Sequence, residues 1–233
     1  WPLNASDGAA NDYFGWNVSI SGTSAIVGAN YDDVGANLNQ GSAYIYVFDT
    51  NTNTWDETKI TASDGATNDN FGISVSISGT SAIVGANYDD VGATPDQGSA
   101  YIYVFDTNTN TWDETKITAS DGAINDNFGF SVSISGTSAI IGARFDDVAA
   151  NVDQGSAYIY VFDTNTNTWD QTKITSSDGA ASDQFGYSVS ISGTSAIVGA
   201  PYDAVGANTG QGSAYVYVFD TNTNTWDETK ITA

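Results

Sequence analysis

A unit of 57 residues occurs four times in succession in this chain, with no insertion or deletion between the copies. A phenylalanine and a tryptophan mark the register of every copy, at Phe14, Phe71, Phe128 and Phe185 and at Trp55, Trp112, Trp169 and Trp226. A fixed period of this length is typical of arrays in which one unit cannot bury its apolar surface without a neighbour. We therefore expect function to lie on surfaces that several units build together.

Each unit reads as four short antiparallel strands. In the second unit, alternating apolar residues, a Gly-Thr turn and a doubly apolar segment predict strands at 72–78, 82–86, 99–106 and 112–117. No segment shows a helical pattern. The expected fold is all-β, a β-propeller built from four near-identical 57-residue four-stranded blades. The chain 1–233 forms a single domain in this interpretation, with repeats 7–63, 64–120, 121–177 and 178–233. A β-solenoid is the alternative, although its coils are usually shorter.

These residues resemble the FG-GAP repeat, which builds the β-propeller of integrin α subunits and of many bacterial surface proteins. A Phe-Gly pair is present in every unit, and the Gly-Ala-Pro element is complete once, at Gly199-Ala200-Pro201. The resemblance implies an extracellular or cell-surface location and a bacterial source. The calcium loop of integrins, D-x-D-x-D-G-x-x-D, is absent, so its metal sites cannot be transferred. The integrin propeller also has seven blades, whereas this chain has four units.

The composition restricts the partners. The formal net charge is −23, from 28 acidic and 5 basic residues, which argues against nucleic acid and against an anionic membrane surface. No apolar run is long enough to insert into a membrane. The chain has no Cys, Met or His, which excludes thiol chemistry, zinc binding by Cys or His, and acid–base catalysis by histidine.

The ends of the chain leave three arrangements open. Both Trp1–Ala5 and Thr229–Ala233 align with Thr58–Ala62, so a closed ring needs only one of the two terminal segments at its seam. We favour a closed ring of four blades. The alternatives are two chains that share a ring of eight blades and a longer stack in which each chain is one segment.

Differences between the four units gather in two loops. In the numbering of the first unit they lie mainly in 10–17 and 30–39, and both loops open on the same face of a propeller. Free drift of long loops explains this pattern as well as a binding surface does. On the second explanation, the ligand-binding face comprises Asn30, Tyr31, Asn87, Tyr88, Arg144, Phe145, Pro201 and Tyr202. The bulky residue that follows each Phe-Gly, as at Trp16, is interpreted as packing near the inner strand.

Acidic residues in the long loop are candidate metal ligands. Carboxylate and carbonyl oxygens suit calcium, and the candidates are Asp32, Asp33, Asp89, Asp90, Asp146, Asp147 and Asp203. The competing interpretation is turn chemistry, because Asp and Asn cap the backbone of such loops.

Three functional hypotheses follow. The first is an exported, non-enzymatic binding or adhesion module whose ligand is a glycan or a protein, with calcium as its one candidate cofactor. The second is a structural subunit of an extracellular fibre or surface layer, in which copies of the chain stack through their blades. The third, a glycan-processing enzyme that uses paired carboxylates, is disfavoured because an active site is usually single and these pairs recur in every unit. We therefore expect no enzymatic activity.

Overall fold

The computed structural model describes residues 4–233, so Trp1–Leu3 of the terminal overlap lie outside the described residues. The described chain forms four antiparallel sheets, and each contains four consecutive strands in sequence order. The first two sheets contain β1 (Val18–Ser21), β2 (Ser24–Ala29), β3 (Ser42–Asp49), β4 (Thr54–Ile60), β5 (Ser74–Ser78), β6 (Ser81–Ala86), β7 (Ser99–Asp106) and β8 (Thr111–Ile117). The last two contain β9 (Phe128–Ser135), β10 (Ser138–Ala143), β11 (Ser156–Asp163), β12 (Thr168–Ile174), β13 (Ser188–Ser192), β14 (Ser195–Ala200), β15 (Ser213–Asp220) and β16 (Thr225–Thr232).

The two tight turns of each blade follow from local backbone chemistry. Gly22 adopts a φ of 59° in the two-residue turn between β1 and β2, a conformation that costs glycine little. In the turn between β3 and β4, the Asp49 carboxylate accepts a hydrogen bond from the backbone N–H of Asn51 at 2.7 Å. The predicted four-strand meander is confirmed, with differences of one or two residues at the strand ends.

The apolar core lies between consecutive blades. One cluster joins Ile26 and Ile45 of the first blade to Phe71, Val75 and Ile77 of the second, and equivalent clusters join the second blade to the third and the third to the fourth. The inner strands β1, β5, β9 and β13 pack against one another in this order. Each blade therefore depends on its neighbours for burial, as the repeat pattern predicts.

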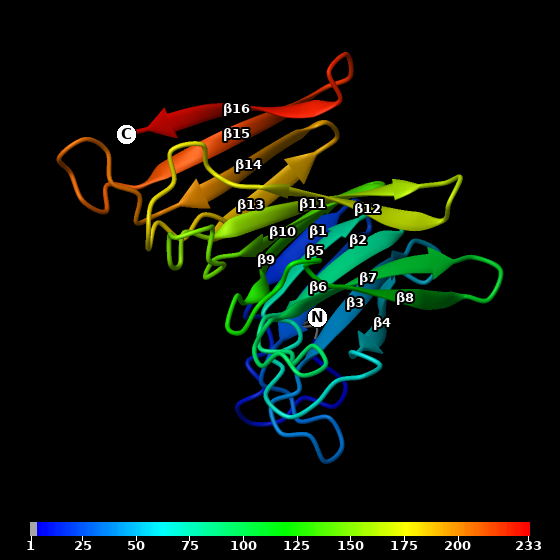
Figure 1. Ribbon diagram of the computed structural model, residues 1–233. Helices are drawn as coiled ribbons and strands as arrows, with labels where there is room; N and C mark the ends of the chain where they lie inside the picture. The colour runs from blue at the N-terminus through cyan, green and yellow to red at the C-terminus, as the bar shows by residue number, and fades with distance from the viewer. Residues whose placement is uncertain (1–3) are drawn as a thin grey trace.

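The four blades form an open array rather than a closed ring. Figure 1 shows the sheets following one another from blue to red, with β16 at the far end from β4. Within residues 4–233, no packing comparable to that between β9 and β13 joins β13 to β1. The favoured expectation of a self-closed four-blade ring is therefore wrong, because the outer faces of the first and last blades do not meet.

Candidate functional site

The two variable loops meet at every blade junction. The backbone N–H of Asn68, in the loop that enters the second blade, donates to the carbonyl of Leu38 in the long loop of the first blade at 2.9 Å. The N–H of Phe71 donates to the carbonyl of Gln40 at 2.8 Å. The variable segments of neighbouring blades thus form one continuous surface, as expected for loops on the same face.

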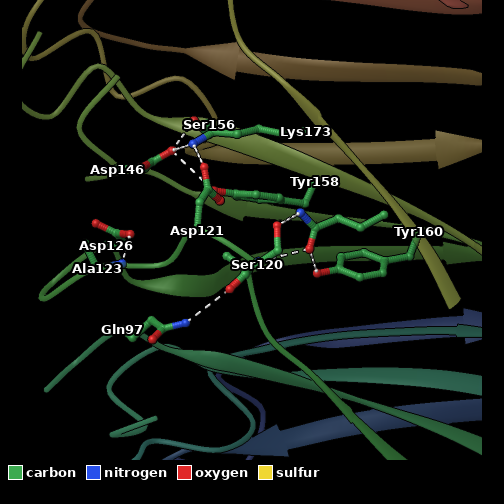
Figure 2. Close-up of polar contacts among 12 residues, drawn as sticks. Gln97, Ser120, Asp121, Ala123, Asp126, Asp146, Ser156, Tyr158, Tyr160 and Lys173 are labelled. Carbon is green, nitrogen blue, oxygen red and sulfur yellow. Dashed lines mark hydrogen bonds and ion pairs between the residues drawn. The ribbon is translucent and has the colours of Figure 1, made fainter. Parts of the chain in front are cut away.

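A lysine in the outer strand of each blade occupies the space between two aspartates. In the third blade, Lys173 Nζ lies 2.7 Å from Asp121 Oδ2 and 2.6 Å from Asp146 Oδ2 (Figure 2). Tyr158 donates to Asp121 at 2.9 Å, and Ser156 donates to Asp146. The same arrangement recurs in the other three blades, around Lys59, Lys116 and Lys230. We call it the lysine cluster.

The lysine cluster favours the charged forms of Asp121 and Lys173. Burial acts to raise the pKa of Asp121, but the hydrogen bonds from Lys173 and Tyr158 lower it below its ordinary value. Burial likewise acts to lower the pKa of Lys173, and its hydrogen bonds to the two aspartates raise it instead. The Lys173 ammonium therefore neutralises part of the acidic loop charge that the sequence suggested for a metal ion.

The predicted calcium ligands have other partners. The first acid of each pair, Asp32, Asp89, Asp146 or Asp203, is buried in a lysine cluster. The second acid caps its own loop: Asp33 accepts from the N–H of Asn39 at 2.8 Å, and Asp90 and Asp147 do the same in their blades. Throughout the described part of the chain, no three acidic side chains come together in a way that could hold a metal ion. This geometry matches the turn-chemistry interpretation.

The predicted ligand face separates into buried and exposed residues. Asn30 and Asn87 are buried, whereas Tyr31, Tyr88, Pro201 and Tyr202 are exposed. Phe145 and Arg144 are half-buried. The guanidinium of Arg144 lies 3.6 Å from the centre of the Phe130 ring and 5.6 Å from that of Tyr187, so this cation joins the third blade to the fourth through aromatic faces.

A cleft of about 350 Å³ lies where the inner strands of all four blades begin. Each blade contributes its residue after Phe-Gly, and the four side chains differ: Trp16, Ile73, Phe130 and Tyr187. Trp16 is 56% exposed, and Tyr13 stacks beside it with ring centres 6.0 Å apart. The interpretation of position 16 as packing is therefore incomplete, because the ring of Trp16 opens to solvent in the cleft. Its bulk and its variation between units were the available signals.

Larger grooves lie between the outer strands on the opposite side of the blades. Two grooves of about 670 and 690 Å³ are lined by equivalent residues, with Trp226 in one and Trp169 in the other. Each tryptophan packs on a phenylalanine of the neighbouring strand, as Trp226 does on Phe219 at 5.3 Å between ring centres. Each groove lies where the outer strands of two neighbouring blades diverge, and the groove recurs because the units have nearly the same sequence.

Buried aspartates near the variable loops have raised pKa values. Asp69 and Asp126 each accept a backbone N–H bond at 2.6 Å, from Ala66 and Ala123. Burial raises the pKa of both carboxyls to about 6, and these hydrogen bonds only partly oppose the effect. The loop face therefore changes its charge in the mildly acidic range.

Three solved structures show similarity to the chain at low sequence identity. A protein of unknown function from Bacteroides fragilis aligns over 89% of this chain and 91% of its own, with 12% identity and a TM-score of 0.37. The acylaminoacyl peptidase of Pyrococcus horikoshii aligns over 93% of this chain and 32% of its own, with 14% identity and a TM-score of 0.44. The β-propeller domain of the Trilobed protease from Pyrococcus furiosus aligns over 97% and 58%, with 10% identity and a TM-score of 0.47.

The chain thus spans about a third of the peptidase and little more than half of the protease chain. These likenesses do not bear on activity. No curated protein sequence matches the chain. In the described part of the structure, no helix has the length and apolar character needed to cross a membrane.

The family model described as the FG-GAP repeat matches the chain four times. The matched segments are residues 2–46, 55–103, 112–160 and 169–217, which together cover most of the chain. Every match contains the Phe-Gly pair of one blade and reaches into its third strand. The four antiparallel sheets agree with the propeller architecture that the repeats imply. The chain therefore belongs to the FG-GAP repeat family.

Proposed function

We propose that this protein is an exported, non-enzymatic binding module that takes a neutral glycan in the cleft between its four inner strands. The observation that carries the proposal is the convergence of four different side chains, one from each blade, on a single cleft beside exposed aromatic rings. Ligand sites are typically concave, with aromatic walls and a few polar groups. Asn17 and Ser188 supply polar groups at the wall of this cleft.

The charge of the protein selects among ligands. A formal net charge of −23 repels polyanions, which include nucleic acids and sulfated or uronic-acid glycans. The C–H face of an uncharged pyranose ring can instead bury apolar surface against Trp16 or Tyr187, and its hydroxyl groups can bond to the polar wall. A protein ligand that inserts an uncharged loop is the alternative occupant.

The family supports an extracellular location, because FG-GAP repeats are typical of extracellular proteins. Calcium is not part of the proposal, since the lysine clusters already hold the buried acids. Catalysis is not part of it either, because the carboxylate pairs are divided between lysine clusters and loop caps in repeated, equivalent positions.

The proposal is tested by titrating neutral oligosaccharides and following the fluorescence of the protein. We expect Trp16→Ala to weaken binding about tenfold, since losing one stacked ring costs about 1.4 kcal/mol. Trp226→Ala, which alters an outer groove, is the matched control and is expected to leave binding unchanged. Equal effects of the two substitutions would refute the cleft as the site, and binding of peptides but no glycan would assign it to a protein ligand.

The second candidate function, a structural subunit assembled from copies of the chain, is favoured by a separate observation. The first and last blades each leave an apolar face open.

A further inference from the structure

The open array has two unlike ends. We define the leading face by Phe14, Gly15, Val18 and Ile20 of the first blade, and the trailing face by Ser188, Ser190, Ile197, Gly199 and Ile231 of the fourth blade. Ile20 is 69% exposed, although its equivalent in the second blade, Ile77, is 4% exposed. Ile197 is 40% exposed, although its equivalent Ile140 is fully buried. Both faces thus expose residues that every internal junction buries.

The internal junctions show what each face is shaped to contact. At the first junction, Ile77 packs in one cluster with Ile26, which is the equivalent of Ile197. At the third junction, Ile191 packs in one cluster with Ile140. A trailing-face isoleucine therefore meets a leading-face isoleucine wherever two blades are joined. The leading and trailing faces are complementary to each other, and neither is complementary to itself.

The backbones of neighbouring blades approach each other closely at one glycine position of the unit. A Cβ added to Gly85 would lie 1.9 Å from the carbonyl oxygen of Gly129 in the next blade, and one added to Gly142 would lie 2.0 Å from that of Gly186. The junctions require glycine at this position because two backbones approach closely. Gly199 has the same place in the fourth blade, but a Cβ there meets only Ser188 of its own blade. At Gly199, the space that the backbone of the next blade fills at the internal junctions is open.

Serine hydroxyls complete the junctions. Ser76 Oγ accepts from the backbone N–H of Ile134, and Ser133 Oγ accepts from that of Ile191, both at 3.1 Å. Ser131 Oγ donates to the carbonyl of Gly186 at 2.8 Å. On the trailing face, Ser190 and Ser188 are the equivalents of these serines. On the leading face, the matching groups are the N–H of Ile20 and the carbonyl of Gly15. Within residues 4–233 these groups form no such bond between blades.

We propose that the trailing face of one chain binds the leading face of a second copy, and that two copies close a ring of eight blades. Propellers typically contain four to eight blades, and two copies of this four-blade array give eight. The pairing rebuilds the internal junction, with Ser190 accepting from Ile20 and Gly199 against Gly15.

This assembly goes beyond the glycan-binding proposal and does not depend on it. It brings Trp16 of one copy beside Tyr187 of the other, in the position that Tyr187 has beside Phe130 within the chain, where the ring centres are 5.2 Å apart. The high negative charge of each copy opposes association through long-range repulsion, and salt screens this repulsion. We therefore expect association to strengthen as salt is raised.

The first test is the light-scattering mass of the purified chain across concentration, at about 0.15 and 0.5 M salt. We expect the mass to rise from 24.3 kDa to twice this value, at lower concentration in the higher salt. A mass that stays at 24.3 kDa under all conditions would overturn the proposal. An open series of larger species would overturn ring closure while supporting the contact between leading and trailing faces.

Two variants test the faces themselves. We expect Ile20→Glu on the leading face and Gly199→Ala on the trailing face each to weaken association at least tenfold. Leu38→Glu introduces the same charge at a loop side chain that is 58% exposed, and we expect it to associate like the unmodified protein. Unfolding midpoints show whether each variant is folded. Dimers that form equally well with Ile20→Glu and with Gly199→Ala would overturn the assigned surfaces.

Mixing the two variants separates this contact from a symmetric one. The Ile20→Glu protein keeps an intact trailing face and the Gly199→Ala protein keeps an intact leading face, so the mixture can form one sound junction. We expect the mixture to give a species of twice the monomer mass at concentrations where each variant alone is monomeric. Failure of the mixture to associate, while the unmodified chain does, would show that like faces pair.

Discussion

Ile77→Ala and Ile20→Ala form a matched pair of substitutions for testing the open array. Both isoleucines occupy the same position of the 57-residue unit, in the same Val-Ser-Ile-Ser sequence. Ile77 is 4% exposed and packs between the first and second blades, whereas Ile20 is 69% exposed on the leading face. Because the local sequence is shared, any difference between the variants reports the presence or absence of a neighbouring blade.

The magnitude follows from the buried fractions. Truncation of a buried isoleucine to alanine costs about 2–5 kcal/mol, from lost apolar burial and from the cavity left behind. Ile20 has only about one third of the burial of Ile77, and an exposed site leaves no closed cavity. We therefore expect a loss of about 3 kcal/mol in unfolding free energy for Ile77→Ala and of about 1 kcal/mol or less for Ile20→Ala.

The assay is urea unfolding followed by tryptophan fluorescence and circular dichroism, at concentrations where the chain is monomeric. The two variants are compared through their midpoints and slopes. Equal losses would refute the open array, because they would mean that another blade covers Ile20. At higher protein concentration, the effect of Ile20→Ala is expected to grow if a second copy covers the leading face.

Three further predictions concern the lysine clusters, the acidic loops and the blade junctions. Lys173→Met leaves two aspartates without their cation, and we expect the free energy of unfolding to fall by about 2–3 kcal/mol, which is less than for fully buried pairs because the lysine is partly exposed. Thermal unfolding is expected to become calcium-dependent in this variant alone. An unchanged thermal unfolding midpoint would contradict the assigned role of the lysine. Burial raises the folded-state pKa of Asp69 and Asp126 to about 6, above the ordinary value of 3.8, so the stability they contribute is present at low pH and is lost as pH rises through 6. The urea midpoint should therefore be higher at pH 5 than at pH 7, and Asp69→Asn with Asp126→Asn should flatten this difference; an unchanged pH profile in the double variant would refute the assignment. Gly142→Ala places a Cβ against the carbonyl of the next blade and is expected to destabilise the monomer by several kcal/mol. Gly199→Ala is expected to leave the stability of the monomer nearly unchanged in dilute solution. Similar urea midpoints for the two variants would contradict the proposed difference between a filled and an open junction.

The blade itself was predictable from the sequence because its strands have clear patterns. The segment Ser99–Asp106 is apolar on both faces, and it is the third strand, covered on both sides, that the pattern predicts. The alternation of serine with valine and isoleucine in β5 predicted a strand but not the role of the serine hydroxyls. In the structure, the hydroxyls of these serines bind backbone groups of the next inner strand. These hydrogen bonds join residues of different repeats that are 55–58 positions apart, so the sequence of a single unit does not indicate them.

The site was less predictable because its residues act across units. The acid pairs suggested calcium because Lys116 lies 27 residues after Asp89 in the sequence, and only the register of β8 against β7 brings this lysine to Asp89. Trp16 and its equivalents differ in every unit, and this variation looks like drift until the four inner strands converge on one cleft. The open arrangement of the four blades was not predicted either. Near-identical units specify how one blade packs on the next, but they do not specify how many blades complete a ring.

Amide hydrogen exchange measured by mass spectrometry in dilute solution tests the central claim, that the four blades form an open array with a free leading face. Peptides over residues 13–21 and 70–78 differ in sequence, so the two equivalent strands can be distinguished. The N–H of Ile77 donates to Ser19 Oγ at 3.2 Å, whereas Ile20 has no such partner in a preceding blade among the described residues. An open array predicts clearly faster exchange in 13–21 than in 70–78. Equal protection of the two peptides in the monomer would contradict it.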